Sequence, residues 1–161
     1  MRFTLMTATA VAALALAACG FQPVYGPEGA GTRLQGQVRV ADPQTADDYA
    51  FLRRLTERLG PEQAVRYDLG YRLQIATVAQ AITEDEVTTR YSLNGTADFA
   101  LTGPGGAVIT QGRVSSFTSY STTGTTISTL AAEGDARERL ALMLADQVVT
   151  RLLAAASGLP D

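Results

Sequence analysis

Apolar and polar residues alternate along three long segments, and this alternation constrains the fold more than any other feature of the sequence. The segments cover residues 67–81, 88–102 and 107–120. A period of two is typical of β-strands that bury one side and leave the other in water. Turn-forming residues at 83–86 and 103–106 connect the segments, so the sequence predicts three consecutive antiparallel strands.

The third segment does not show clearly which of its sides is buried. Val108 and Val114 occupy even-numbered positions, whereas Ile109 and Phe117 occupy odd-numbered ones, so in a regular strand the two pairs would point to opposite sides. A β-bulge between them adds one residue to the strand and would bring the two sets to one face. We therefore expect a bulge in this strand.

A short strand and a helix are expected before these three strands. Residues 37–41 alternate briefly, and a helix capped by Thr45 or Asp47 should then run to about residue 59. Its apolar face would hold Leu52, Leu55 and Leu59. The arginines at 53, 54 and 58 lie largely off that face, which predicts a solvated surface or, alternatively, a patch for an anionic ligand.

A second helix is expected from about residue 135 to residue 156. Four apolar residues recur there at intervals of four: Leu140, Leu144, Val148 and Leu152. The preceding segment, 121–130, is dense in Ser, Thr and Gly and predicts a mobile loop.

The elements therefore follow the order β-α-β-β-β-α and predict an α+β fold. Each helix has one apolar stripe, so both should cover the same face of a mostly antiparallel four-stranded sheet. The opposite face would be too polar for a core, since it carries Arg72, Gln74, Arg90, Ser92, Asn94 and Asp98. The sequence predicts a two-layer α/β sandwich with one open sheet face, in a single domain over residues 37–161.

The first eighteen residues have the features of a cleaved secretory signal peptide. Arg2 provides a positive start, and an apolar run rich in Ala, Leu and Val follows to residue 18. That run is shorter than the ~20 apolar residues that a membrane-spanning helix needs. We therefore expect the mature chain to begin at residue 19.

Cys19 is the single cysteine, and it follows Leu-Ala-Ala in a pattern that resembles a bacterial lipobox. In that pathway the thiol accepts a diacylglyceryl group, and cleavage frees the cysteine amine for acylation with a fatty acid such as palmitate. Several acyl chains on one residue anchor a protein to a membrane without spanning it. Gly20 replaces the Asp that commonly retains lipoproteins at the inner membrane, so we expect outer-membrane localisation, with residues 19–36 as anchor and tether.

The composition argues against most kinds of catalysis and ligand chemistry. The chain has no His, and all thirteen basic residues are Arg, which removes imidazole metal ligands, Ser-His pairs and lysine nucleophiles. One Cys excludes an internal disulfide and a thiolate zinc site. A net charge of -3 gives no case for a nucleic-acid partner. We expect no catalytic residue, no metal and no cofactor.

The segment CGFQPVYG at residues 19–26 resembles the mature N-terminus of LPS-assembly lipoproteins of the LptE family, alphaproteobacterial type. The meander of long strands, the Ser/Thr-rich segment and the C-terminal helix fit the plan of that family. The resemblance implies a plug in the lumen of a large outer-membrane β-barrel, LptD. It implies a role in barrel assembly and in the delivery of lipopolysaccharide to the cell surface, without catalysis.

The resemblance also implies that basic residues contact lipopolysaccharide. On the predicted open face, Arg72, Arg90 and Arg113 carry guanidinium groups that suit phosphates and carboxylates. We take Ser92 and Asn94 as further candidates for contact with a ligand or partner. Arg72 could instead form a cross-strand pair with Asp98.

Two other classes of function stay open at this point. One is an auxiliary lipoprotein of an inner-membrane ABC-type lipid transporter, with a similar size, anchor and architecture. The other is a periplasmic hydrolase that uses carboxylates such as Asp98 or Glu133, although the sequence has no paired-carboxylate pattern. The open face could also simply contact water.

Overall fold

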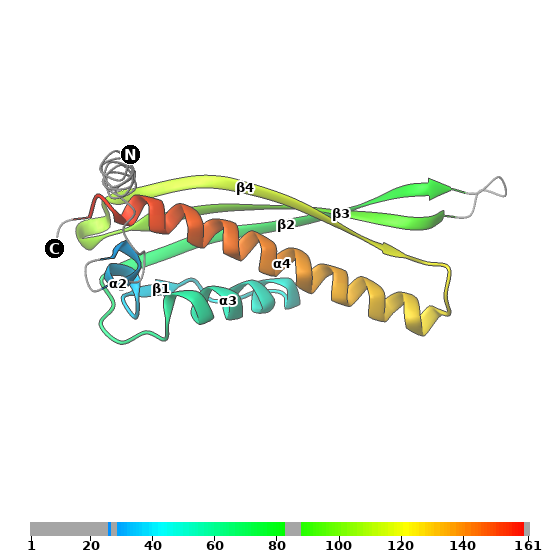
Figure 1. The fold of residues 1–161 in the computed structure, drawn as a ribbon, viewed down its shortest axis with the longest axis horizontal. Helices are drawn as coiled ribbons and strands as arrows, with labels where there is room; N and C mark the ends of the chain where they lie inside the picture. The colour runs from blue at the N-terminus through cyan, green and yellow to red at the C-terminus, as the bar shows by residue number, and fades with distance from the viewer. Residues whose placement is uncertain (1–25, 27–28, 83–87, 160–161) are drawn as a thin grey trace, which may run out of the picture.

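A computed structural model describes residue 26 and residues 29–82 and 88–159. Its elements in chain order are α2 (Ala30–Leu34), β1 (Val38–Val40), α3 (Ala46–Leu59), β2 (Tyr67–Ile82), β3 (Thr88–Thr102), the 3-10 turn η1 (Pro104–Gly106), β4 (Val108–Ser121) and α4 (Thr126–Ala156). The molecule is elongated, and α3 and α4 lie together on one side of the sheet (Figure 1). The predicted α+β class is confirmed.

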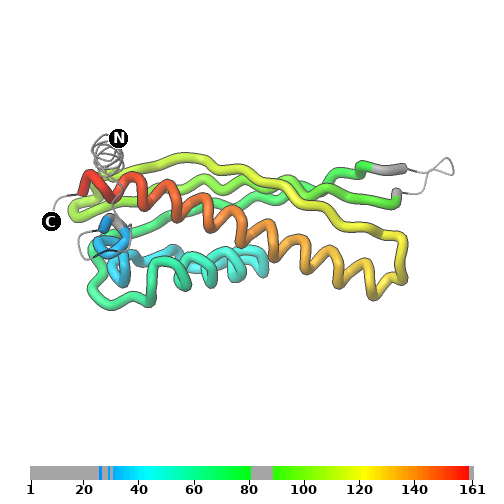
Figure 2. Tube along the Cα trace, in the orientation of Figure 1, coloured from blue at the N-terminus to red at the C-terminus, as the bar shows by residue number. Residues whose placement is uncertain are grey.

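The four strands lie side by side in the order β1-β2-β3-β4. β1 pairs in parallel with only the first residues of β2, Tyr67 to Leu69. The β2–β3 and β3–β4 pairs are antiparallel over nearly their whole length, as the alternation predicted. The strands β2 and β3 extend well beyond the N-terminal end of α3, toward the far end of the molecule (Figure 2).

The core lies between the sheet and the two long helices. Alternate residues of β3 point into it, among them Leu93, Ala97 and Leu101, none of which is exposed. The helix α4 packs along β3 and β4, and its four-residue stripe is fully buried as expected. The helix α3 packs against α4, and the ring of Phe51 lies 4.9 Å from that of Tyr71 in β2.

The start of α3 follows directly from its sequence. Thr45 is the N-cap: its hydroxyl accepts a hydrogen bond from the Asp48 amide, and the Asp48 carboxylate accepts one from the Thr45 amide. Phe51, Leu55 and Leu59 form the buried face, whereas Leu52 is only half-buried.

The arginines of α3 are neither simply solvated nor an open patch for an anionic ligand, because they bind acids on α4. Arg54 donates two hydrogen bonds to Asp146, at 3.0 and 3.1 Å, and Arg58 donates a third at 2.8 Å. Arg53 pairs with Glu138. These contacts join the two helices along their exposed seam.

The expected loop at 121–130 is wrong over most of its length, because α4 begins at Thr126 rather than near residue 135. Thr125 caps the helix and accepts a hydrogen bond from the Ser128 amide at 3.3 Å. Ion pairs one turn apart, Glu133 with Arg137 and Asp135 with Arg139, support the early turns.

The expected tether at 19–36 also differs from the structure, since its end packs on the domain. Leu34 of α2 is fully buried, and Arg33 donates a hydrogen bond of 2.6 Å to the Leu159 carbonyl. The signal peptide, Cys19 and the turn at 83–86 lie outside the described residues.

The expected bulge in β4 is present, but of Ile109 and Phe117 it brings only Ile109 to the buried face of the sheet. The register shifts between the pairs Leu101–Thr110 and Thr102–Val108, which leaves Ile109 as the extra residue, and it packs against the core. Phe117 stays on the open face and is 73% exposed.

Candidate partner-binding surface

The sheet face that points away from α3 and α4 is the candidate surface, which we call the open face. Pairing in the sheet places even-numbered residues of β2 and β3 on it, together with odd-numbered residues of β4 beyond the bulge. It carries Arg72, Gln74, Asn94, Thr96, Asp98, Arg113, Ser115 and Phe117. Among the described elements, no helix lies over it (Figure 1).

A row of three charges crosses the open face. Arg72 of β2 pairs in register with Asp98 of β3, which pairs with Arg113 of β4. Arg113 donates two hydrogen bonds to the Asp98 carboxylate, at 2.6 and 2.9 Å. Those bonds, with a smaller contribution from the charge of Arg72, hold the pKa of Asp98 below its ordinary value. Arg72 and Asp98 are register neighbours, as a cross-strand pair requires, but within the described residues the Asp98 carboxylate makes its hydrogen bonds to Arg113.

The five candidate contact residues are not brought together as one site. Arg72 and Arg113 flank Asp98, but Arg90 lies eight residues along β3 from Asp98, about 26 Å away in an extended strand. Of these three arginines, Arg113 is occupied by Asp98, while Arg72 and Arg90 donate no hydrogen bond to the described part of the chain. A phosphate or carboxylate ligand would therefore meet separate cations.

Ser92 and Asn94 differ in accessibility. Ser92 is only 2% exposed, and its hydroxyl donates to the Thr118 carbonyl at 3.4 Å, so it offers no group to a partner. Asn94 is exposed, and its register neighbour on β4 is Phe117.

Phe117 is the functional candidate that the sequence reasoning missed. Phe117 occupies an odd-numbered position, as do Arg113 and Ser115, and this spacing was the sequence feature that could have placed it on the open face. Its apolar character favoured a core position instead. An exposed aromatic ring within a polar face is typical of residues that anchor protein interfaces.

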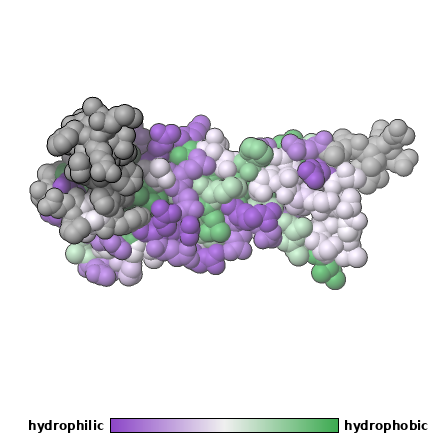
Figure 3. Space-filling view, viewed as in Figure 1, coloured by the Kyte–Doolittle hydropathy of each residue, from purple (hydrophilic) through white to green (hydrophobic). Residues whose placement is uncertain are grey.

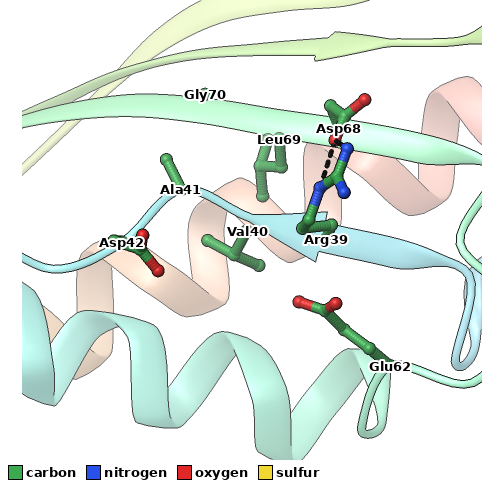
Figure 4. A pocket seen from close by; sticks show the side chains of 8 residues that line it. All are labelled: Arg39, Val40, Ala41, Asp42, Glu62, Asp68, Leu69 and Gly70. Atoms are coloured by element: carbon green, nitrogen blue, oxygen red, sulfur yellow. Dashed lines mark hydrogen bonds and ion pairs between the residues drawn. The ribbon is translucent and has the colours of Figure 1, made fainter.

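A separate hollow of about 470 Å³ lies between β1 and the end of α3 (Figure 4). Arg39 pairs with Asp68 beside it at 2.6 Å, while Asp42 lies on the segment after β1 and Glu62 on the segment after α3. Within the described ranges, neither the Asp42 carboxylate nor the Glu62 carboxylate accepts a hydrogen bond, although the Asp42 backbone carbonyl accepts one from the Gln44 side chain. The hollow therefore suits a basic group rather than an anionic lipid.

A smaller hollow of about 190 Å³ lies next to it, lined in part by Asp42, Asp48 and Tyr71. Burial, reinforced by the charges of Asp48 and Asp42, raises the pKa of Tyr71 to about 12. Arg72 also lines this hollow, so its charged residues are two acids and one arginine. Within the described ranges, no three acids or cysteines are grouped so as to hold a metal ion, and no helix is long and apolar enough to cross a membrane.

Comparison with solved structures places this fold among bacterial lipoproteins. A proposed lipoprotein of Caulobacter crescentus CB15 superposes with a TM-score of 0.68 at 20% identity, covering 83% of this chain and 100% of that one. Rare lipoprotein B of Shewanella oneidensis superposes with a TM-score of 0.59 at 11% identity, covering 75% of this chain and 95% of that one. A minor lipoprotein of Acinetobacter baumannii superposes with a TM-score of 0.53 at 17% identity, covering 73% of this chain and 89% of that one. At these identities the likeness concerns the fold.

The sequence itself matches one protein family. No curated protein sequence matches the chain at a significant level. Residues 33–152, which span β1 to β4 and nearly all of α4, match the family described as LptE, Lipopolysaccharide-assembly. This chain therefore belongs to the LptE family of lipopolysaccharide-assembly proteins.

Proposed function

We propose that this chain is an outer-membrane lipoprotein that serves as plug and assembly partner of an LptD-like β-barrel in delivering lipopolysaccharide to the outer leaflet. The observation that carries the proposal is the uncovered, polar open face of a chain that belongs to the LptE family. Barrel lumens are polar, so a face of Arg, Asn, Ser and Thr side chains is compatible with one. The role is non-enzymatic.

The open face has one exposed aromatic residue surrounded by polar side chains. This composition is typical of an interface that contains bridging water. Phe117 provides the apolar contact, and Asn94, Ser115 and Thr96 surround it with groups that can bond to a partner or to bridging water. Arg72 and Arg90 are free to bind phosphates of lipopolysaccharide, whereas Arg113 would first have to leave Asp98.

Acylation of Cys19 would keep the domain close to the membrane. Nine residues separate Cys19 from Gly29, where the continuously described chain begins, so the fully extended connection spans at most about 35 Å. Residues 30–34 of the expected tether are packed as α2 and add nothing to this length. A domain held this close could enter a barrel in the same membrane.

Replacing Cys19 by Ala should abolish fatty-acid incorporation, because the chain has no other thiol. Metabolic labelling with a clickable fatty acid measures this. Cys19→Ser, which keeps the size of the side chain but supplies no thiol, should behave in the same way. Unchanged labelling of either variant would show that the anchor lies elsewhere.

A photo-crosslinking amino acid at Phe117 should capture an outer-membrane β-barrel. Tyr49 on α3 is the matched control, since it is also an aromatic residue and is 64% exposed, against 73% for Phe117. Capture from Tyr49 alone would mean that the helical layer, not the open face, meets the partner. Capture of an inner-membrane ABC transporter would favour the auxiliary-lipoprotein alternative, and capture by neither residue would contradict the plug.

A further inference from the structure

The outer edge of β2 is left without a neighbouring strand along most of its length. β1 pairs only with Tyr67 to Leu69, and the last backbone bond on this side runs from the Ala41 amide to the Leu69 carbonyl. From Tyr71 onward, no strand of the described chain lies beside this edge (Figure 2).

The backbone groups that face outward can be assigned from the bonds near β1. The Tyr67 amide donates to Gln37, and the Leu69 carbonyl accepts from Ala41, so odd-numbered residues of β2 point toward β1. The N–H and C=O of one strand residue point the same way, and the direction alternates along the strand. The outward groups beyond β1 therefore belong to Tyr71, Leu73, Ile75, Thr77 and Ala79, over about 27 Å.

The two edge strands of the sheet, β2 and β4, differ in the features that protect an edge from pairing with another chain. Natural proteins protect free edges with charges, proline or bulges. The β4 edge has the bulge at Ile109 and the charge of Arg113, and Gln147 of α4 donates to the Ser115 carbonyl at 3.3 Å. The β2 edge from Leu73 to Ala79 has no charge, proline or glycine, and its register with β3 shifts only beyond Ala79.

The surroundings of the β2 edge change along its length. At its beginning lie the two acidic hollows, with Asp42, Asp48 and Glu62. Toward its far end, Thr77, Val78 and Ala79 are exposed. The space-filling view shows the strongly hydrophilic residues over the middle of the molecule and paler ones toward the far end (Figure 3).

We propose that the β2 edge binds an extended segment of the barrel partner as an added strand. The segment is uncharged where it runs beside Leu73 to Ala79 and carries an Arg or Lys where it passes Asp42 and Glu62. Main-chain bonds provide the affinity and the acidic end sets the register, as in other cases of strand addition. The choice of partner rests on the proposed function.

A second copy of this chain fits the edge less well. Antiparallel self-pairing centred on Ile75 would place Ala79 of one copy opposite Tyr71 of the other. The uncharged residues Ala79 and Gln80 would then lie at the end of the edge where Asp42 and Glu62 lie, so a second copy would bring no basic group to these acids.

The test is affinity purification of the tagged full-length lipoprotein from detergent-solubilised outer membranes, with the co-purified barrel quantified. Thr77→Pro removes one outward N–H and no internal ladder bond, and should lower the barrel yield by about two- to tenfold, the effect of losing one hydrogen bond. Thr77→Val keeps the N–H and should leave the yield unchanged. Thermal melting of both purified variants reports whether they fold.

A second pair of variants tests the edge without proline. Ala79→Lys introduces the protecting charge that the edge lacks and should also lower the yield, whereas Ala79→Ser should not. A photo-crosslinking residue at Thr77 should capture the barrel. Normal yields with both Thr77→Pro and Ala79→Lys would overturn the strand addition while leaving the plug intact, and so would capture of a second copy. A wild-type chain that brings down no barrel would overturn both proposals.

Discussion

Replacing Leu144 by Ala should lower the free energy of unfolding by about 2–5 kcal/mol. Leu144 has no exposed surface and lies on the stripe of α4 that packs against the sheet. Its Cδ1 lies 2.8 Å from the position that a Cβ would take on Gly95 of β3. Leu140 and Val148, also fully buried, hold α4 on either side, so the helix cannot close the cavity. Urea-induced unfolding of the soluble domain measures the loss.

Leu130→Ala provides the matched control for Leu144→Ala. It is the same substitution on the same helix, but Leu130 is 64% exposed. Its effect should stay within about 0.5 kcal/mol, as for most surface substitutions. A loss below about 1 kcal/mol for Leu144→Ala would contradict the packing of α4 against the sheet.

The sequence predicted best those parts of the fold whose signal is repeated many times. Three strands and the later turns of α4 carry long periodic patterns, and each additional residue strengthens the same conclusion. The early turns of α4 have the composition of a loop, and their helical state depends on the cap at Thr125 and on two ion pairs. Such local geometry has no periodicity that composition alone could detect.

Contacts between separate elements were harder to predict for a physical reason. The binding of Asp146 by Arg54 and Arg58 depends on how two helices are rotated and shifted relative to one another. Neither quantity is encoded in one helix alone. The Arg72–Asp98 neighbourhood could be predicted because the two residues lie on consecutive antiparallel strands, where the alternation of each strand shows which residues share a face.

The candidate surface was predicted as a face but not residue by residue. Parity alone placed Ser92 on the open face, yet its neighbours cover it and its hydroxyl bonds to the Thr118 carbonyl. Alternation leaves Phe117 undecided, and the bulge, which lies at Ile109, does not bring it to the buried face. The free edge of β2 could not be foreseen, since the alternation of residues 37–41 does not reveal that β1 covers only three residues of its neighbour.

Replacing Gly95 by Ala should destabilise the domain by about 1–3 kcal/mol, the usual effect of overpacking a filled core. The added Cβ would stand 2.8 Å from Leu144 Cδ1 and 3.0 Å from Leu140 Cγ and Cδ2. Both leucines are fully buried, so a shift of either one would disturb other side chains of the core. Gly134→Ala on α4 is the control: nothing lies within 4 Å of its Cβ position, so better helix propensity should stabilise the domain by about 0.5–1 kcal/mol.

The double variant Gly95→Ala with Leu144→Ala separates close packing from any other cause of the Gly95 effect. Truncating Leu144 removes the methyl group nearest to the new Cβ, so the two losses should not add. The double variant should be more stable than the sum of the single losses predicts, by about 0.5–3 kcal/mol, the range found for residues in contact. Relief is incomplete because Leu140 still lies at 3.0 Å. Additive losses would show that Leu144 is not the reason why β3 carries a glycine where it crosses α4.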